Sequence, residues 1–317
     1  MIAGPRTLVA IVGATATGKS DLGEQVARGI GGEVVCADAR QVFGELEVGT
    51  GKPSPSERDA IPHHLFEALA LEDRPTAGWY ARVARETCEA VFARGATPVL
   101  VGGSGLYLRA LLEGLHPEPP VDPGARLRVR EELEAAGPEA LHARLAGVDP
   151  ETAARLAPRD RQRVSRAIEV FESSGKPLSW WHAHAEKEPF AAEARLLEVV
   201  CEPAELSARI ERRTRAMFEG GLVEETRALA EAGRERALEA LKAIGYDEAL
   251  ALLRGRHSRA AAEERTNQRT RQLAKRQRTW FRHQVSAELL PACEKWEGPA
   301  LAAAFAALRL TPRRALP

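Results

Sequence analysis

The sequence predicts an α/β fold in which helices cover both faces of a parallel sheet and a helical insertion interrupts the chain. Three short apolar runs, at residues 7–12, 32–38 and 97–105, are rich in β-branched side chains. Parallel strands read as continuous apolar runs because both of their faces are buried. Stretches with helical periodicity separate the runs, and this alternation is typical of a parallel sheet with helical crossovers.

The helices between these runs follow from the spacing of apolar side chains. In residues 19–30 an apolar side chain recurs every four positions, and residues 79–95 form a second amphipathic pattern. A loop-rich stretch, residues 44–63, precedes this second helix. The first half of the chain therefore predicts strand and helix in strict alternation.

A proline-rich segment, residues 116–124, marks a change in this pattern. The helical stretches that follow contain no apolar run until residues 194–203, which have strand character again, and the chain beyond them reads as helical throughout. We therefore expect an α/β core formed by residues 1–118 and 191–317, with helices at its C-terminal end. Residues 119–190 are expected to form a helical insertion domain.

Composition and charge exclude several classes of protein. A length of 317 residues corresponds to about two domains, or to one large domain with an insertion. The formal net charge is zero, so no overall field attracts nucleic acid or a membrane. Four widely separated cysteines without a CxxC pair argue against a zinc site and a disulfide framework. With no signal-peptide pattern and no apolar run of about 18 residues, a cytoplasmic protein is expected.

Residues 13–20, GATATGKS, fit the phosphate-binding loop G-x-x-x-x-G-K-[ST] and lie between a strand and a helix, as this motif requires. Its glycines allow backbone N–H groups to surround a phosphate, Lys19 adds a positive charge, and the Ser20 hydroxyl can bind Mg²⁺. The sheet is therefore expected to be P-loop NTPase-like, although neither the N-K-x-D motif of GTPases nor the hhhhDE strand of ATPase motors is present. The spacing leaves the phosphate compound open. The predicted ligand-binding residues are Gly13, Ala14, Thr15, Ala16, Thr17, Gly18, Lys19 and Ser20.

Asp38 is the best candidate for a catalytic carboxylate. It ends the second apolar run, and ligands of open α/β sheets bind at the carboxyl ends of the strands. A carboxylate there could accept a proton from a nucleophile that attacks the phosphate-bearing substrate. It could equally cap a helix or close an Asx turn, and its position alone leaves both readings open.

Ordered motifs along nearly the whole chain resemble those of the bacterial tRNA dimethylallyltransferases, also called tRNA isopentenyltransferases. Each motif is short, but the set in this order is highly specific. The matching stretches are GATATGKS, DARQVF, VGTGKP, PHHL, LVGGSGLYLRALLEGL, DRQRVSRAIEV, RTRAMFEGGLVEE, AIGYDE and TRQLAKRQRTWFR. The chain departs from the family pattern at four positions without losing a charged catalytic group. These are Ala14, Ala39, Lys242 and Leu273, where Pro, Ser, Gln and Tyr are common.

The resemblance implies that the phosphate loop binds dimethylallyl diphosphate rather than a nucleotide. The five-carbon group would pass to N6 of the adenosine immediately 3′ of the anticodon in tRNA, and diphosphate would leave. Mg²⁺ near Ser20 would help to stabilise the charge on the leaving group. By the same match, Thr15 lies near the scissile oxygen and Asp38 takes the N6 proton, so both are expected to be catalytic.

The resemblance also implies where RNA binds. Asp38, Ala39, Arg40 and Gln41 would surround the flipped adenosine, and Ser104 and Arg126 would contact the RNA. The tRNA-binding residues expected on a helix of the insertion are Gln162, Arg163, Val164, Ser165 and Arg166. Without the resemblance, that helix would read as an ordinary exposed basic face. The expected partners are the anticodon stem-loop of tRNA and dimethylallyl diphosphate, bound by a monomer without membrane contact.

A second basic segment, residues 265–287, supports an RNA partner without reference to any family. It contains seven Lys or Arg residues and no Asp or Glu. On a helix, Arg265, Arg269 and Arg276 share one face and are expected to point at an anionic ligand, whereas Trp280 is expected to pack in the core. His63 and His64 have no suitably spaced further ligands, and we interpret them as structural.

Three other functions compete with the transferase. Prenyl transfer to free AMP or ADP would use the same chemistry, but it would need neither the insertion nor the basic helix. A small-molecule kinase would use the loop and Asp38, but the sequence lacks the arginine pattern of a kinase lid. An RNA-binding module with a vestigial loop is disfavoured because Lys19, Ser20 and Asp38 are all intact.

Overall fold

A single parallel sheet of six strands organises the fold, which the computed structural model describes for residues 6–312. The strand order is β3-β2-β4-β1-β5-β6, and every neighbouring pair is parallel. The predicted α/β class is confirmed. The strands are β1 (Thr7–Gly13), β2 (Gly32–Cys36), β3 (His63–His64), β4 (Thr97–Gly102), β5 (Glu193–Val200) and β6 (Glu288–Pro291).

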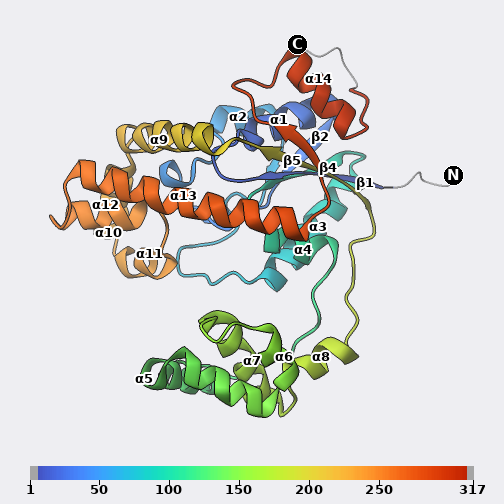
Figure 1. Ribbon diagram of the computed structural model, residues 1–317. Helices are drawn as coiled ribbons and strands as arrows, with labels where there is room; N and C mark the ends of the chain where they lie inside the picture. Colours follow the sequence, from blue (N-terminus) through green and yellow to red (C-terminus); the bar gives the residue numbers. More distant parts are fainter. Residues whose placement is uncertain (1–5, 313–317) are drawn as a thin grey trace. The chain divides into compact units, whose positions relative to one another are not determined.

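Helices cover both faces of the sheet, as Figure 1 shows. Side chains alternate along β1: Val9 and Ile11 enter one core, and Leu8, Ala10 and Val12 enter the other. Helices α1 (Lys19–Ile30) and α14 (Gly298–Ala307) pack on the first face, and α3 (Ala77–Ala93) and α4 (Gly105–Leu112) pack on the second. The remaining helices of this part are α2 (Pro55–Ala60), α9 (Pro203–Glu219), α10 (Leu222–Glu231), α11 (Glu235–Leu241), α12 (Tyr246–Leu253) and α13 (Arg259–Gln284).

The two edge strands were not predicted. The segment after residue 203 was expected to be entirely helical, but β6 lies within it and pairs with β5. The loop-rich stretch 44–63 contains the short helix α2 and leads into the two-residue strand β3, which pairs with β2. Both strands are too short to show a periodicity, so only pairing with a neighbour stabilises them.

The chain divides into two compact units. One combines the chain up to Leu112 with the chain from Phe190 onward, and the other is Glu113–Pro189. The second unit begins at Glu113 rather than at residue 119. It contains α5 (Pro123–Val148), α6 (Pro150–Arg155), α7 (Arg161–Ser174) and α8 (Leu178–His184).

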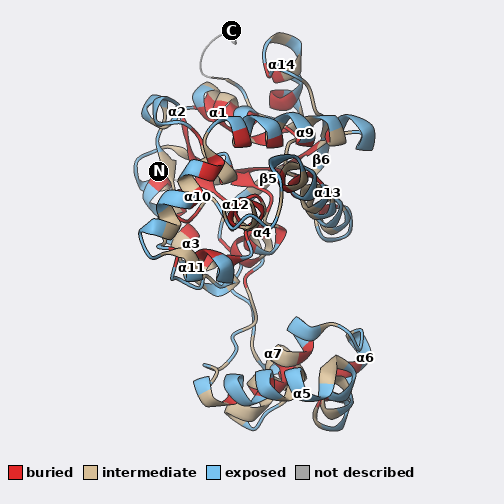
Figure 2. Cartoon of the chain, turned by 90° about the vertical axis from the view of Figure 1, so that its left-hand side faces the viewer, coloured by how far each residue is buried: buried red, intermediate tan, exposed pale blue. Residues whose placement is uncertain are grey.

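The smaller unit has a hydrophobic core of its own. Val129, Leu141 and Leu145 of α5 pack against Val164 and Ile168 of α7. Figure 2 shows the buried residues of α5 and α7 in red. Because each unit encloses its own apolar side chains, each has the organisation of a separate domain. Within residues 6–312, no helix combines the length and the apolar character that crossing a membrane requires.

Candidate active site

The phosphate loop connects β1 to α1 and has the backbone geometry that phosphate binding needs. Gly13 has a φ of 147°, and a Cβ at this position would lie 2.6 Å from the carbonyl oxygen of Val199. Gly18 has a φ of 87° and forms the N-cap of α1 without any side-chain cap. No side chain of the described residues caps the first N–H groups of α1, so these groups can bind an anionic ligand, which the helix dipole also attracts.

Lys19 lies folded against this loop. Its Nζ donates a hydrogen bond to the carbonyl oxygen of Ala14 at 3.3 Å, and the residue is buried. Burial lowers the pKa of Lys19 from 10.5 to about 8, although Asp38 nearby opposes this change. The neighbouring Thr17 is 1% exposed, and its hydroxyl donates to the same carbonyl oxygen, so its side chain stabilises the loop.

A crevice of about 540 Å³ opens beside the loop, at the carboxyl ends of β1, β2 and β4. This volume lies within the range of small-molecule sites, roughly 300–1,000 Å³. The crevice brings together most of the residues predicted for the core of the protein. Those that line it are Thr15, Lys19, Ser20, Asp38, Ala39, Arg40, Gln41 and Ser104.

Asp38 closes an Asx turn and also lines the crevice, so its structural role and a catalytic role are compatible. Its Oδ1 accepts hydrogen bonds from the backbone N–H groups of Arg40 at 2.8 Å and Gln41 at 3.4 Å, which is an Asx turn. Its Oδ2 accepts no hydrogen bond from any residue between 6 and 312. Lys19 and Arg213, which also line the crevice, both interact electrostatically with Asp38. One carboxylate oxygen is thus used by the fold, and the other is available to a ligand.

The segment after Asp38 is held by the end of β4. The Oγ of Ser104 accepts a hydrogen bond from the N–H of Ala39 at 2.9 Å. At Gly102 a Cβ would lie 2.0 Å from the carbonyl oxygen of Ala37, so only glycine permits this approach of the two strand ends. Arg40 donates to the carbonyl oxygen of Leu241 at 2.8 Å. Hydrogen bonds thus fix the floor of the crevice at several points.

Two side chains of the crevice were matched in the sequence but were given no role. Arg213 of α9 donates to the carbonyl oxygen of Thr50 at 2.9 Å and to the Thr15 hydroxyl at 3.5 Å. Burial lowers the pKa of Arg213, and Asp38 opposes this change. Gln277 of α13 accepts from the N–H of Thr15 at 2.9 Å and donates to the carbonyl oxygen of Gly103 at 2.9 Å. Both residues lie in stretches that resemble the family pattern, and this resemblance is the sequence feature that could have identified them as site residues.

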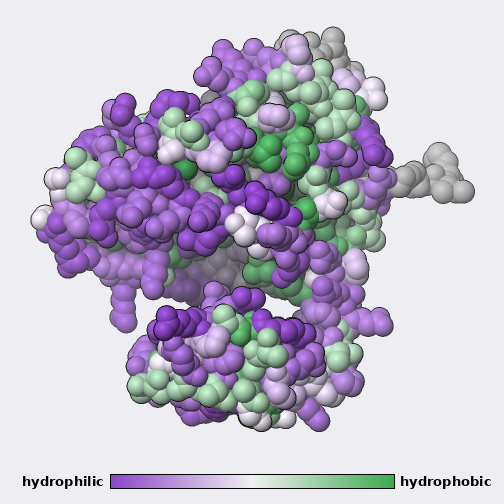
Figure 3. Space-filling view, viewed as in Figure 1, coloured by the Kyte–Doolittle hydropathy of each residue, from purple (hydrophilic) through white to green (hydrophobic). Residues whose placement is uncertain are grey.

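The basic helix α13 is only partly available to a ligand. Arg269 lines the crevice, but Asp247 at 2.8 Å and Glu248 at 2.6 Å already balance its charge. That it faces an anionic ligand stays a prediction. Arg276 also lines the crevice and has no carboxylate partner within the described part of the chain. Trp280 is half-buried and packs against Gly105, where a Cβ would lie 2.0 Å from its ring. Hydrophilic side chains cover this face over α12 and α13 (Figure 3).

The predicted tRNA-binding residues of the smaller unit differ in exposure. Arg126, Gln162 and Arg163 are exposed, and Arg166 donates to Glu118 at 2.7 Å. Val164 is 0% exposed and belongs to the core of this unit. Its side chain therefore has no access to a ligand. The buried Oγ of Ser165 has no hydrogen-bond partner among residues 6–312.

His63 and His64 form β3 and bind other parts of the fold. His63 hydrogen-bonds the carbonyl oxygen of Ile61 at 2.9 Å, and its Nε2 lies 3.6 Å from Glu24. His64 contacts Glu33 at 2.6 Å. The described residues contain no group of three or more His, Cys, Asp or Glu side chains able to hold a metal ion.

A phosphate loop that faces a carboxylate across the carboxyl ends of a parallel sheet defines a P-loop enzyme of the α/β class. Comparison with known proteins narrows this class. The family model described as IPP transferase matches residues 41–284, and the model described as isopentenyl transferase matches residues 6–65. The chain belongs to the tRNA dimethylallyltransferase family, and it is therefore a transferase.

Individual relatives agree with this assignment. The chain is 44% identical over 287 residues to the tRNA dimethylallyltransferase of Sorangium cellulosum, covering 89% of this chain and 90% of the relative. It is 40% identical over 284 residues to that of Desulfovibrio desulfuricans, covering 90% and 88%. Among solved structures, a tRNA isopentenylpyrophosphate transferase from Bacillus halodurans matches with a TM-score of 0.65 and 30% identity over 90% of each chain. A eukaryotic dimethylallyltransferase acting on tRNA matches with a TM-score of 0.82 and 27% identity over 95% of this chain and 78% of that one.

The low pKa of Lys19 predicts that anion binding weakens as pH rises through about 8. Above this pH the free protein loses the Lys19 ammonium, which an anionic ligand requires, so binding there must take up a proton. Calorimetric titration with inorganic diphosphate in two buffers of different ionisation enthalpy measures this uptake. A Lys19→Met variant is the control, because it retains only the titration of the ligand. Equal proton uptake by the two proteins would contradict the prediction.

Proposed function

We propose that this chain, acting as a monomer, transfers the dimethylallyl group of dimethylallyl diphosphate to N6 of the adenosine immediately 3′ of the anticodon in tRNA. Dimethylallyl transfer to tRNA follows from the family to which the chain belongs. One observation supports the assignment of the crevice as the active site: Asp38, whose Oδ2 accepts no hydrogen bond within residues 6–312, lines the same cavity as the phosphate loop. A proton acceptor and an anion site side by side are what this reaction needs.

On the diphosphate side, the loop N–H groups, Lys19 and Arg213 would bind the leaving group. As the C1–O bond of the allylic substrate breaks, its electron pair passes to the diphosphate oxygen, and these donors stabilise the charge that develops there. Gln277 occupies the N–H of Thr15, so the Thr15 hydroxyl rather than its amide would contact the bridging oxygen. Arg213 lies at hydrogen-bond distance from that hydroxyl and would polarise it.

On the acceptor side, Asp38 would act as the general base. The N6 lone pair attacks C1 of the allyl group, a C–N bond forms, and the N6 proton passes to Oδ2 of Asp38. The exocyclic amine of adenine is a weak nucleophile, so removal of its proton within hydrogen-bond reach contributes to the rate. The Asx turn holds the carboxylate in one orientation while this happens.

The residues present fit a Mg²⁺ ion bound mainly through the substrate. Ser20 lines the crevice beside Lys19, and its hydroxyl makes no hydrogen bond within residues 6–312. Mg²⁺ usually binds proteins through one or two side chains, with phosphate oxygens and water completing its shell. Ser20 would hold such an ion, which when bound neutralises charge on the diphosphate.

For tRNA, we propose that the adenosine is flipped into the crevice and read by residues 38–41, Ser104 and Arg276. An adenosine stacked in the anticodon loop exposes N6 only after it leaves the stack. The smaller unit would contact RNA phosphates through Arg126, Arg163 and Arg166, together with Gln162. The exposure of the cations on α5 and α7 supports this role.

The decisive experiment is mass analysis of nucleosides from unmodified tRNA that has been incubated with the protein, Mg²⁺ and dimethylallyl diphosphate. The expected product is an adenosine heavier by one dimethylallyl group. Parallel reactions replace tRNA by AMP or ADP, or replace dimethylallyl diphosphate by ATP. A prenylated mononucleotide would indicate the smaller acceptor. Phosphoryl transfer from ATP without prenylated tRNA would indicate a kinase, and either result would overturn the proposal.

A further inference from the structure

A short turn next to the crevice orients two of its side chains. This turn is the 3₁₀ helix Val48–Thr50 with the following Gly51. The carbonyl oxygens of Thr50 and Gly51 accept hydrogen bonds from the Gln41 amide at 3.2 and 3.0 Å. The Thr50 oxygen also accepts from Arg213 at 2.9 Å. Any displacement of the turn therefore moves a residue of the base pocket and a residue of the diphosphate site together.

Two side chains outside the crevice hold the start of this turn. Both carboxylate oxygens of Glu225, on α10, accept backbone hydrogen bonds, from Glu47 at 3.0 Å and from Val48 at 2.8 Å. The hydroxyl of Tyr246, at the start of α12, donates to Glu225 and accepts from the N–H of Gly49 at 3.1 Å. Three consecutive backbone N–H groups, those of Glu47, Val48 and Gly49, thus bind one carboxylate–phenol pair.

Tyr246 of this pair is buried, and Glu225 is partly buried. Tyr246 is 0% exposed, and burial and the Glu225 carboxylate both raise its pKa, so its hydroxyl stays protonated and remains a donor. At Gly49 a Cβ would lie 2.3 Å from the Tyr246 ring and 2.8 Å from Leu222. The turn backbone therefore rests directly on the aromatic ring, and the position of the ring fixes that of the turn.

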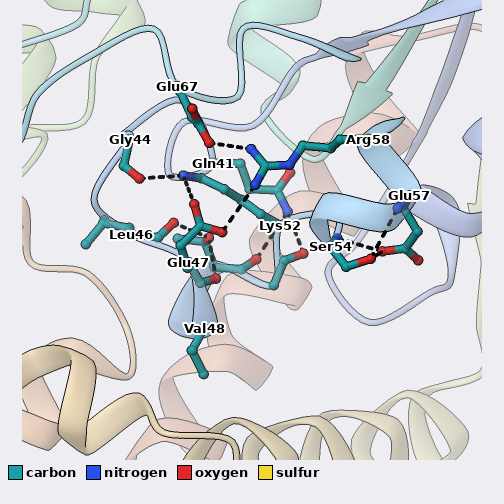
Figure 4. A network of polar contacts seen from close by, with 12 residues as sticks. Gln41, Gly44, Leu46, Glu47, Val48, Lys52, Ser54, Glu57, Arg58 and Glu67 are labelled. Atoms are coloured by element: carbon teal, nitrogen blue, oxygen red, sulfur yellow. Dashed lines mark hydrogen bonds and ion pairs between the residues drawn. The ribbon is translucent and has the colours of Figure 1, made fainter. Parts of the chain in front are cut away.

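Lys52 and Arg58 hold the chain next to the same turn (Figure 4). The Lys52 side chain is 0% exposed, and its Nζ donates to the carbonyl oxygen of Gly44 at 3.0 Å and to Glu47 at 3.1 Å. Arg58 bridges Glu47 and Glu67. In Figure 4, the Gln41 side chain and the Val48 side chain lie on opposite sides of the turn. The contacts of Lys52 and Arg58 hold the chain on either side of the turn, whereas Tyr246 and Glu225 bind backbone N–H groups at its start.

We propose that Tyr246 and Glu225 are positioning residues for the transfer reaction, acting through the turn on Arg213 and Gln41. Neither residue lines the crevice, so neither touches substrate. The inference rests on the proposed function of that crevice. Loss of the Tyr246 hydroxyl removes the acceptor of the Gly49 N–H and one of the three donors to Glu225, so we expect the turn to shift and the Thr50 oxygen to hold Arg213 less firmly against Thr15. Small displacements of this kind cost up to about 10²-fold in rate.

The test is the Tyr246→Phe variant, which removes one oxygen atom and keeps the ring that supports Gly49. We expect its single-turnover rate with saturating substrates to fall by about 10-fold to 10²-fold, with unchanged affinity for tRNA. The matched control is Thr226→Val. Thr226 is buried next to Glu225 on α10, and its hydroxyl donates to the backbone carbonyl oxygen of Leu222 in the same helix rather than to the turn. The control is expected to lose comparable stability and to keep the wild-type rate.

A double-mutant cycle separates positioning from a general loss of stability. The double variant Tyr246→Phe/Arg213→Lys is expected to lower the transfer rate by less than the product of the two single effects, because both changes disrupt the same contact between the turn and Arg213. Arg166→Ala is expected to weaken tRNA binding. Its effect should be additive with that of Tyr246→Phe, because the two changes act on different steps. Glu225→Gln provides a second variant with the same expected pattern. If the wild-type protein is inactive, the proposed function is wrong. If the wild-type protein is active but Tyr246→Phe has the same transfer rate as Thr226→Val, this inference alone is wrong. The same holds if the effects of Tyr246→Phe and Arg213→Lys on the transfer rate are additive.

Discussion

Replacement of Asp38 by Asn is expected to lower the single-turnover rate of dimethylallyl transfer by about 10²–10⁴, the range typical of losing a general base. The structure explains why Asn is a sharper probe than Ala. Its amide oxygen can still accept the N–H groups of Arg40 and Gln41, so the Asx turn survives. Only the basic oxygen that faces the crevice is lost. The measurement is a rapid-quench assay with enzyme in excess over tRNA.

Binding provides the control for this prediction. Calorimetry with inorganic diphosphate should give the wild-type affinity or a slightly higher one, because the variant removes a negative charge near Lys19. The Asp38→Ala variant removes the turn acceptor as well and should also lose thermal stability. If Asp38→Asn transfers the dimethylallyl group at the wild-type rate, Asp38 serves the turn and another group removes the proton.

Replacement of Arg213 by Met is expected to lower the rate of transfer by about 10²–10³, the effect of removing one donor from a developing oxyanion. The guanidinium would contact the leaving group while it binds Thr50 and Thr15, so the KM for dimethylallyl diphosphate should rise as well. Arg213→Lys should recover little, because one ammonium group cannot reproduce the planar fork of the guanidinium. Steady-state kinetics with each substrate varied in turn measures both effects.

Arg212 supplies the matched control for Arg213. It is the preceding residue on the same helix, α9, and it is exposed rather than directed into the crevice. Arg212→Met removes the same charge from the same element, so it reports any general loss of positive charge. Equal kinetic parameters for the two variants would show that Arg213 contributes only to the overall field and not to a specific contact.

The alternating strands and helices and the phosphate loop were predictable because they depend on residues close together in the sequence. A buried parallel strand is a continuous apolar run, and the loop is defined by two glycines, a lysine and a serine at fixed spacing. The position of Asp38 at a strand end follows from the same local pattern. The crevice that brings Asp38 and Lys19 together is therefore a consequence of parallel topology, which sequence periodicity already implied.

Contacts between distant segments could not be predicted in the same way. Arg213 lies 198 residues from Thr15, and Gln277 lies 262 residues from it, yet both bind that one residue of the loop. Nothing in the basic pattern of α13 distinguishes Arg269, which is neutralised by Asp247 and Glu248, from Arg276, which has no such partner in the described residues. Whether a cation is paired depends on the residues that packing brings to it.

The amino-acid sequence alone establishes an α/β core with a phosphate loop and a carboxylate at a neighbouring strand end. The periodicity of buried strands and the stereochemistry of a glycine-rich turn are properties of a few consecutive residues. The folded structure was needed to show that one oxygen of Asp38 takes no part in the Asx turn, that Arg213 reaches the phosphate loop, and that Tyr246 and Glu225 support the turn at residues 48–51. Each of these depends on hydrogen bonds and close packing between segments that are far apart in the chain.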